Sequence, residues 1–270
     1  MEKIEFKKLG NESLHLWVYD AATKSDKNRT AMIWIHGGGW YSGDPGYFGD
    51  DYDYFIKMGI VCFGIEYRLV STTESDPMAE KLHGAVNDCI DAVLFIKNNA
   101  DKFGVDRNKI IIVGESAGGH LALCFATDIV NKINKNAIPQ MVIAYNPVIE
   151  TIAKWSTSTG KIDNIKMDEE YFYSRYKVLK EISPIHNIVK NNIPLLLLTG
   201  IDDCVVYPGE VLDFYEKYLL AGNDAIIKLY PNTTHAFALP FYYDRGMESR
   251  DKSLKDIERF MIDYRCMTNI

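Results

Sequence analysis

The sequence lacks the features that would mark a nucleic-acid-binding or membrane protein. Its 270 residues carry a formal net charge of −7 and contain no block of lysine and arginine, which argues against a surface for nucleic acid or anionic lipid. No stretch approaches the roughly 18 uninterrupted apolar residues of a transmembrane helix. The first residues lack the continuous apolar core of a signal peptide. We therefore expect a cytoplasmic protein.

Cysteine is scarce and shows no pairing pattern. The chain has five cysteines and no CxxC, so we expect buried, reduced thiols rather than disulfides or a metal site. The cysteines are Cys62, Cys89, Cys124, Cys204 and Cys266. The sequence also lacks the lysine of GxxxxGK[ST] and the GxGxxG spacing of phosphate-binding loops. No metal or organic cofactor is implied.

What the sequence does contain is an alternation of apolar strand-like runs and amphipathic helix patterns. Two short alternating segments around Gly10 and Asn11 predict an antiparallel strand pair at the N-terminus. Later runs such as "AMIWIH", "KIIIVG" and "PLLLLTG" are apolar throughout, which is typical of strands covered on both faces. Residues 76–104, 209–223 and 253–267 carry apolar stripes at helical spacing. The fold class predicted is α/β, with a mostly parallel sheet between helices.

One segment interrupts this alternation. Residues 150–192 separate two predicted strands by far more than one ordinary crossover and include the polar run "STSTGKIDN". We expect a single domain over residues 1–270, with a cap-like insertion at about residues 150–182.

The run "KIIIVGESAGGHLAL" places a serine where a buried strand gives way to a helix. A sharp strand-to-helix turn of the GxSxG type exposes a serine hydroxyl, and the helix N-terminus favours negative charge beside it. Ser116 is therefore a candidate nucleophile; the alternative is a plain tight turn. Glu115, directly before it, is a candidate substrate-binding residue.

A nucleophilic serine needs a base and a carboxylate that orients the base. Of the six histidines, His235 follows a late strand and should emerge at the carboxyl edge of the sheet, where Ser116 also lies. His120 lies one helical turn after Ser116 and is badly placed to face its hydroxyl, so we expect a structural role. The carboxylate comes from "TGIDDC", as Asp202 or Asp203.

Acyl transfer also needs donors for the oxyanion. The segment "WIHGGGWYSGD" follows an early strand, and its glycines allow backbone N–H groups to turn towards a substrate oxygen. Gly38, Gly39 and the N–H of Ala117 are the candidate donors. Trp40 is either a wall of the substrate pocket, and so a substrate-binding residue, or a core aromatic.

Six blocks in this order resemble the hormone-sensitive-lipase-like branch of the α/β-hydrolase fold, and they are similar to the small carbohydrate-acting and feruloyl esterases. The blocks are "HGGGW", "IEYRL", "FGVDRNKIIIVGESAGG", "ISPIHNI", "TGIDDCVV" and "THAF". The resemblance implies Ser116 as nucleophile, His235 as base and Asp203, rather than Asp202, as the acid. It implies Gly38, Gly39 and Ala117 as oxyanion donors.

The expected function is hydrolysis of carboxylic esters, of short acyl chains by analogy with the family, through an acyl-enzyme intermediate. The alternatives are a peptidase or aryl-formamidase with the same triad, or a non-catalytic ligand-binding member of the fold. We expect a small-molecule ester as partner, no nucleic acid and no membrane, and a homodimer is compatible with the sequence.

Overall fold

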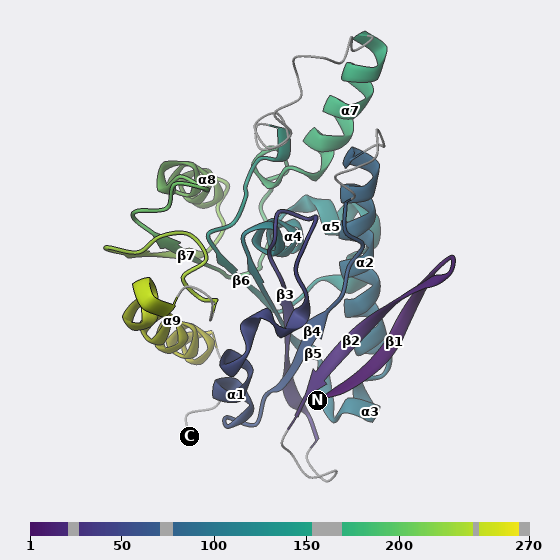
Figure 1. Ribbon diagram of the computed structural model, residues 1–270, viewed down its shortest axis with the longest axis vertical. Coiled ribbons are helices and arrows are strands. Elements are labelled where there is room, and N and C mark those ends of the chain that lie inside the picture. The colour runs from purple at the N-terminus through teal and green to yellow at the C-terminus, as the bar shows by residue number, and fades with distance from the viewer. Residues whose placement is uncertain (21–26, 71–77, 153–168, 240–242, 265–270) are drawn as a thin grey trace.

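The protein is built on one eight-stranded sheet, seen in the computed structural model, which describes residues 1–20, 27–70, 78–152, 169–239 and 243–264 (Figure 1). The strand order is β1-β2-β4-β3-β5-β6-β7-β8. The strands are β1 (Glu2–Leu9), β2 (Glu12–Tyr19), β3 (Arg29–Ile35), β4 (Val61–Ile65), β5 (Val105–Glu115), β6 (Met141–Tyr145), β7 (Leu195–Gly200) and β8 (Ala225–Tyr230).

Among the described strands, antiparallel pairing occurs only at β1 and β2. β1 pairs antiparallel with β2, and β2 pairs antiparallel with β4, whereas all pairs from β4 to β8 are parallel. Both the N-terminal strand pair and the mostly parallel sheet are confirmed. Because the parallel strands run in one direction, their carboxyl ends, including those of β5 and β8, lie at one edge of the sheet.

Helices cover both faces of the sheet, as the apolar strands predicted. The main helices are α1 (Asp50–Ile56), α2 (Met78–Asn98), α3 (Ala100–Phe103), α4 (Ala117–Ala126), α5 (Asp128–Asn134), α7 (Glu169–Ile182), α8 (Pro208–Leu220) and α9 (Tyr243–Asp263). Short 3-10 turns lie at Pro45–Phe48, Lys135–Ala137 and Pro184–His186.

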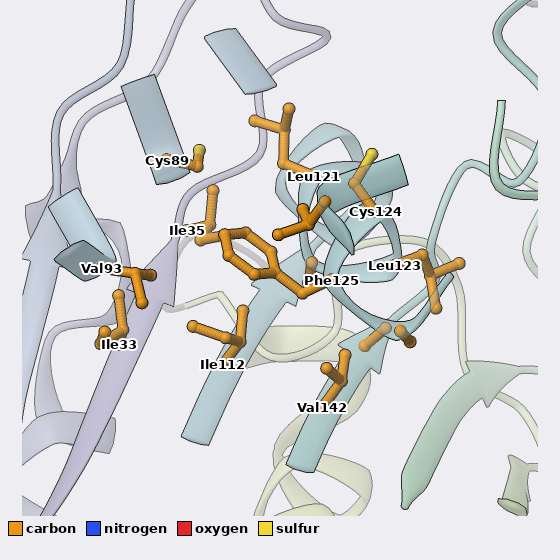
Figure 2. Close-up of a cluster of buried hydrophobic side chains, with 14 of the residues drawn as sticks. Ile33, Ile35, Cys89, Val93, Ile112, Leu121, Leu123, Cys124, Phe125 and Val142 are labelled. Carbon is orange, nitrogen blue, oxygen red and sulfur yellow. The ribbon is translucent and has the colours of Figure 1, made fainter. Parts of the chain in front are cut away.

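Alternate residues of the central strands enter two separate cores. On one face Ile33 and Ile112 belong to a core that also contains residues of α2, α4 and α8. On the other face Trp34 and Val113 belong to a core that contains residues of α1 and α9. Figure 2 shows the first core, in which Phe125 points from α4 towards Ile35 and Ile112. The nucleophile helix α4 is thus fixed by apolar packing along its full length, since all ten of its residues are buried.

The predicted insertion is described in part. α7 lies inside its expected range and packs against α2, projecting beyond it (Figure 1). Residues 153–168 of the predicted insertion lie outside the described residues, and a cap role stays a prediction.

The cysteine prediction needs one correction. Cys62, Cys89 and Cys124 are buried free thiols, but Cys204 is a free thiol on the surface. It falls in the loop after β7, where the apolar strand pattern has ended. Cys266 lies outside the described residues. Within the described ranges no helix is long and apolar enough to span a membrane.

Candidate active site

Ser116 lies at the sharp turn between β5 and α4. Its φ of 54° and ψ of −114° are strained for a residue with a side chain. The turn closes because Gly114 and Gly118 leave room: a Cβ at Gly114 would collide with the Gly118 carbonyl, and one at Gly118 with the Ile35 carbonyl. The strand-to-helix elbow expected around Ser116 is therefore present.

Three side chains from three separate strand ends meet at this turn. The Ser116 Oγ lies 2.9 Å from His235 Nε2, and His235 Nδ1 lies 2.7 Å from Asp203 Oδ2. The other carboxylate oxygen of Asp203 accepts hydrogen bonds from the backbone N–H groups of Val205 and Val206, at 2.8 and 2.9 Å. These hydrogen bonds hold the Asp203 carboxylate in place beside the His235 ring, as is required of a group that orients the base.

Asp202, the alternative acid, does not reach the ring. It is exposed, and its backbone N–H donates to the Thr233 carbonyl at 2.9 Å. The structure therefore places Asp203 and not Asp202 beside His235.

The expected oxyanion donors lie in a tightly turned loop after β3, residues 36–43, which we call the glycine loop. Gly38 and Gly39 have φ values of 105° and 62°. The Gly38 carbonyl accepts bonds from the N–H groups of Tyr41 and Ser42 and from the Ser42 hydroxyl. The N–H groups of Gly38, Gly39 and Ala117 take part in no hydrogen bond within the described part of the chain. Their role as oxyanion donors stays a prediction.

Glu115 is buried next to the nucleophile. Its Oε1 lies 3.8 Å from His235 Nε2 and has no hydrogen-bond partner among the described residues. Burial raises the pKa of Glu115 to about 7, with a smaller opposing effect of His235. A Cβ on Gly37 would collide with the Glu115 carboxyl, so this glycine leaves the space for it.

Trp40 is buried at 4% exposure, and its indole N–H donates to His120 Nδ1 at 3.3 Å. These contacts favour the core alternative over the pocket wall. A direct substrate contact for Trp40 or Glu115 stays a prediction. Sequence reasoning missed the Trp40–His120 bond, although the positions of "HGGGW" and "SAGGH" at adjacent strand ends were a signal that the two segments meet.

The remaining histidines are held elsewhere. On β2, His15 Nδ1 lies 2.9 Å from Glu66 Oε2; on α2, His83 forms a hydrogen bond with Asn87; and His186 Nε2 lies 3.0 Å from Glu150 Oε1. The ring of His36 is stacked on Tyr67. None of these four rings contacts Ser116. Among the described residues no cluster of three or more His, Cys, Asp or Glu could hold a metal ion.

Known proteins share this architecture. An esterase of Thermogutta terrifontis, solved with butyrate bound, superposes with a TM-score of 0.80 at 26% identity and covers 100% of this chain and 96% of that chain. The same esterase phosphorylated by paraoxon gives a TM-score of 0.78.

Two curated esterases are also similar in sequence. An acetylxylan esterase of Xylanibacter ruminicola is 24% identical over 236 residues, which cover 84% of this chain and 45% of that enzyme. Esterase LipC of Mycobacterium tuberculosis is 24% identical over 227 residues, covering 79% of this chain and 54% of that protein. The chain thus spans about half the length of these relatives.

The BD-FAE family model matches residues 16–218, a span that contains Ser116 and Asp203. His235 lies beyond the matched span. The expected resemblance is confirmed: the chain belongs to the BD-FAE family, within the hormone-sensitive-lipase-like esterase branch of the α/β-hydrolase superfamily.

Proposed function

We propose that this protein hydrolyses carboxylic esters through a Ser116–His235–Asp203 triad. The observation that carries the proposal is the continuous hydrogen-bonded line from Ser116 Oγ through both nitrogens of His235 to Asp203. Nucleophile and base are within hydrogen-bond reach, and a third group orients the base, which is the arrangement of an activated serine. The esterase names of the relatives support the choice of reaction.

The geometry supports the following order of proton transfers. A carboxylate only accepts hydrogen bonds, so His235 carries its proton on Nδ1, towards Asp203, and leaves Nε2 free to accept the Ser116 proton. As the Ser116 Oγ attacks the ester carbonyl, that proton passes to Nε2. The imidazolium then gives it to the departing alcohol oxygen, leaving an acyl group on Ser116.

Water completes the cycle by the same route. His235 Nε2 removes a proton from the water as it attacks the acyl carbonyl, and Ser116 Oγ regains a proton as the carboxylic acid departs. In both steps the tetrahedral oxyanion would accept hydrogen bonds from Gly38, Gly39 and Ala117 N–H groups. Each such donor contributes on the order of 3 kcal/mol of transition-state stabilisation.

We further propose a preference for short acyl chains. The similar esterase from Thermogutta terrifontis has been solved with butyrate and with propionate bound, and a similar protein of Pseudomonas putida is an ethyl acetate hydrolase. Butyrate and propionate are small acids and ethyl acetate is a small ester. We propose that the substrates of this protein carry acyl groups of similar size.

The test compares initial rates on p-nitrophenyl acetate, butyrate and octanoate with rates on aminoacyl p-nitroanilides and N-formylkynurenine. We expect kcat/KM to be highest for the two short esters. Ser116→Ala should lower kcat by about 10⁴-fold or more. Faster turnover of anilides would favour a peptidase, and faster turnover of formylkynurenine would favour an aryl-formamidase. Octanoate cleaved faster than butyrate would overturn only the acyl-length preference.

A further inference from the structure

A buried hydrogen-bond relay joins the glycine loop, the nucleophile helix and the end of the insertion. The indole N–H of Trp40 donates to His120 Nδ1 at 3.3 Å, and the opposite ring nitrogen, Nε2, lies 2.8 Å from the Ile182 carbonyl oxygen. Trp40 ends the "HGGGW" block, His120 is on α4, and Ile182 is the last residue of α7. Three segments far apart in sequence therefore meet at one imidazole.

The chemistry of the two partners fixes the protonation of that imidazole. An indole N–H can only donate and a carbonyl can only accept. His120 must therefore be neutral, with its proton on Nε2 and its lone pair on Nδ1. Burial also lowers the pKa of His120 to about 4, with the Ile182 carbonyl opposing the shift. Protonation of Nδ1 would remove the acceptor on which Trp40 depends.

Trp40 is under conformational strain, which its contacts hold in place. Its φ is 66°, directly after Gly38 at 105° and Gly39 at 62°, and a tryptophan rarely occupies this left-handed region. Besides the bond to His120, the Trp40 carbonyl accepts the Val70 N–H at 2.8 Å. The two rings also meet edge to face, with centroids 5.5 Å apart. A strained residue persists only where its surroundings determine it.

His120 is also hydrogen-bonded to the backbone of the nucleophile. The backbone N–H of His120 donates to the Ser116 carbonyl at 3.0 Å, because the two residues are one helical turn apart. The ring at the other end of His120 then holds Trp40, adjacent to Gly39. The position of the glycine loop relative to Ser116 is thus set through one side chain.

We infer that His120 is a positioning residue for ester hydrolysis: by accepting the Trp40 hydrogen bond it holds the Gly38 and Gly39 N–H groups where the oxyanion forms. Its second bond ties the same loop to the end of α7. The inference rests on the proposed function, since it concerns the oxyanion donors of that reaction. His120 touches neither the substrate nor the reacting atoms, and it acts through Trp40.

Two substitutions of His120 separate its two hydrogen bonds. His120→Asn places an amide oxygen near the position of Nδ1, which keeps an acceptor for Trp40 but loses the bond to Ile182. His120→Gln places an amide N–H near the position of Nε2, which keeps the bond to Ile182 but leaves the indole without its acceptor. Trp40→Phe removes the indole N–H and leaves His120 unchanged.

We expect His120→Gln and Trp40→Phe each to lower kcat about tenfold, with KM within about twofold, because the lost bond acts on the transition state. His120→Asn should keep kcat within about threefold. The double variant Trp40→Phe/His120→Gln should be no slower than the slower single variant, since both single changes remove the same bond. Rates are expressed per active site titrated with a fluorophosphonate, at a temperature where circular dichroism shows each variant folded.

A purely structural role predicts a different result. In that case all three variants lose thermal stability while kcat per titrated site stays unchanged, and the inference is overturned. Equal losses of kcat in His120→Asn and His120→Gln would also overturn it. If His120→Gln does not fold, the test compares kcat of Trp40→Phe with kcat of His120→Asn, and equal values would overturn the inference. Ester hydrolysis that survives in Ser116→Ala would instead refute the proposed function, whereas an inactive Ser116→Ala with fully active His120→Gln and Trp40→Phe refutes this inference alone.

Discussion

Two buried carboxyl groups in different regions of the molecule have opposite surroundings. Asp88 on α2 is fully buried, and both of its oxygens accept hydrogen bonds: from the Arg68 N–H, Nε and Nη2 at 3.1, 2.7 and 2.8 Å, and from Lys7 Nζ at 2.6 Å. Glu115, beside the nucleophile, is equally buried, but its Oε1 has no partner in the described part of the chain.

The difference shows in the proton affinities of the two groups. Burial alone would raise the pKa of Asp88, but the hydrogen bonds and charges of Arg68 and Lys7 outweigh it and lower the pKa. At Glu115 burial prevails and the pKa rises to about 7. Donors, more than burial, decide the state of an interior carboxyl group. The Asp88 region secures α2 to β1, whereas the Glu115 region keeps an unsatisfied group within 4 Å of a base.

Asp203 lies in the site and, like Asp88, has hydrogen bonds to both carboxylate oxygens. Asp203→Asn should lower kcat by about 10⁴-fold, because the amide can donate to His235 Nδ1 and so favours the wrong tautomer. Asp202→Asn is the matched control; its side chain is exposed, and kcat should change by less than about twofold. The measurement is kcat on p-nitrophenyl butyrate. Equal losses in the two variants would contradict the assignment of Asp203.

The Asp88 region should affect stability without affecting chemistry. Asp88→Asn removes a charge that Arg68 and Lys7 both contact, and we expect the free energy of unfolding to fall by about 3–5 kcal/mol. Denaturant unfolding measures this loss. The control is Asp91→Asn: Asp91 contacts the same Lys7, but its side chain is 46% exposed, so the loss should be below about 1 kcal/mol. A changed kcat per titrated site in folded Asp88→Asn would break the separation of the two regions.

The contribution of Glu115 to the free energy of unfolding should fall as the pH rises. Its pKa in the folded protein, about 7, lies above its ordinary value of 4.5. Its contribution to stability is therefore complete below pH 4.5 and is lost as the pH rises through 7. Glu115→Gln cannot titrate, so relative to the native protein it should gain on the order of 3 kcal/mol between pH 5 and pH 8.

Melting temperatures across this pH range test the prediction, and Asp88→Asn provides the control. The lowered pKa of Asp88 means that its contribution is lost only as the pH falls below the ordinary range of aspartate, so its deficit should stay flat from pH 5 to pH 8. A flat difference for Glu115→Gln as well would show that Glu115 is ionised throughout.

Much of the fold could be predicted from sequence because burial leaves a periodic pattern. The central strands are apolar on both faces, and α2 and α8 carry apolar stripes, so their positions followed directly. The short helix α1, "DDYDYFI", was not predicted, since seven residues with three aspartates give no clear stripe. α9 begins at Tyr243, ten residues earlier than its apolar pattern predicted, because its first turns are largely polar.

The site was predictable where chemistry follows strand ends, and less so where it depends on side-chain direction. Ser116 and His235 were placed at one edge of the sheet by the order of strands alone. The sequence pattern did not decide whether Asp202 or Asp203 is the acid, because the geometry of the loop sets which carboxylate points at the His235 ring. The adjacent strand ends indicated that the Trp40 and His120 segments meet, but the Trp40–His120–Ile182 relay also depends on the rotamers of Trp40 and His120 and on the position of the Ile182 carbonyl, which spacing in the sequence does not encode.

Covalent labelling tests directly whether Ser116 is an activated nucleophile. Treatment of the native protein with a fluorophosphonate, followed by intact-mass and peptide analysis, should give one adduct per chain, located on Ser116. Ser116→Ala should give none, and Asp203→Asn should react much more slowly than Asp202→Asn. No adduct on the folded native protein, or an equal adduct on Ser116→Ala, would contradict a Ser116 nucleophile activated by His235 and Asp203.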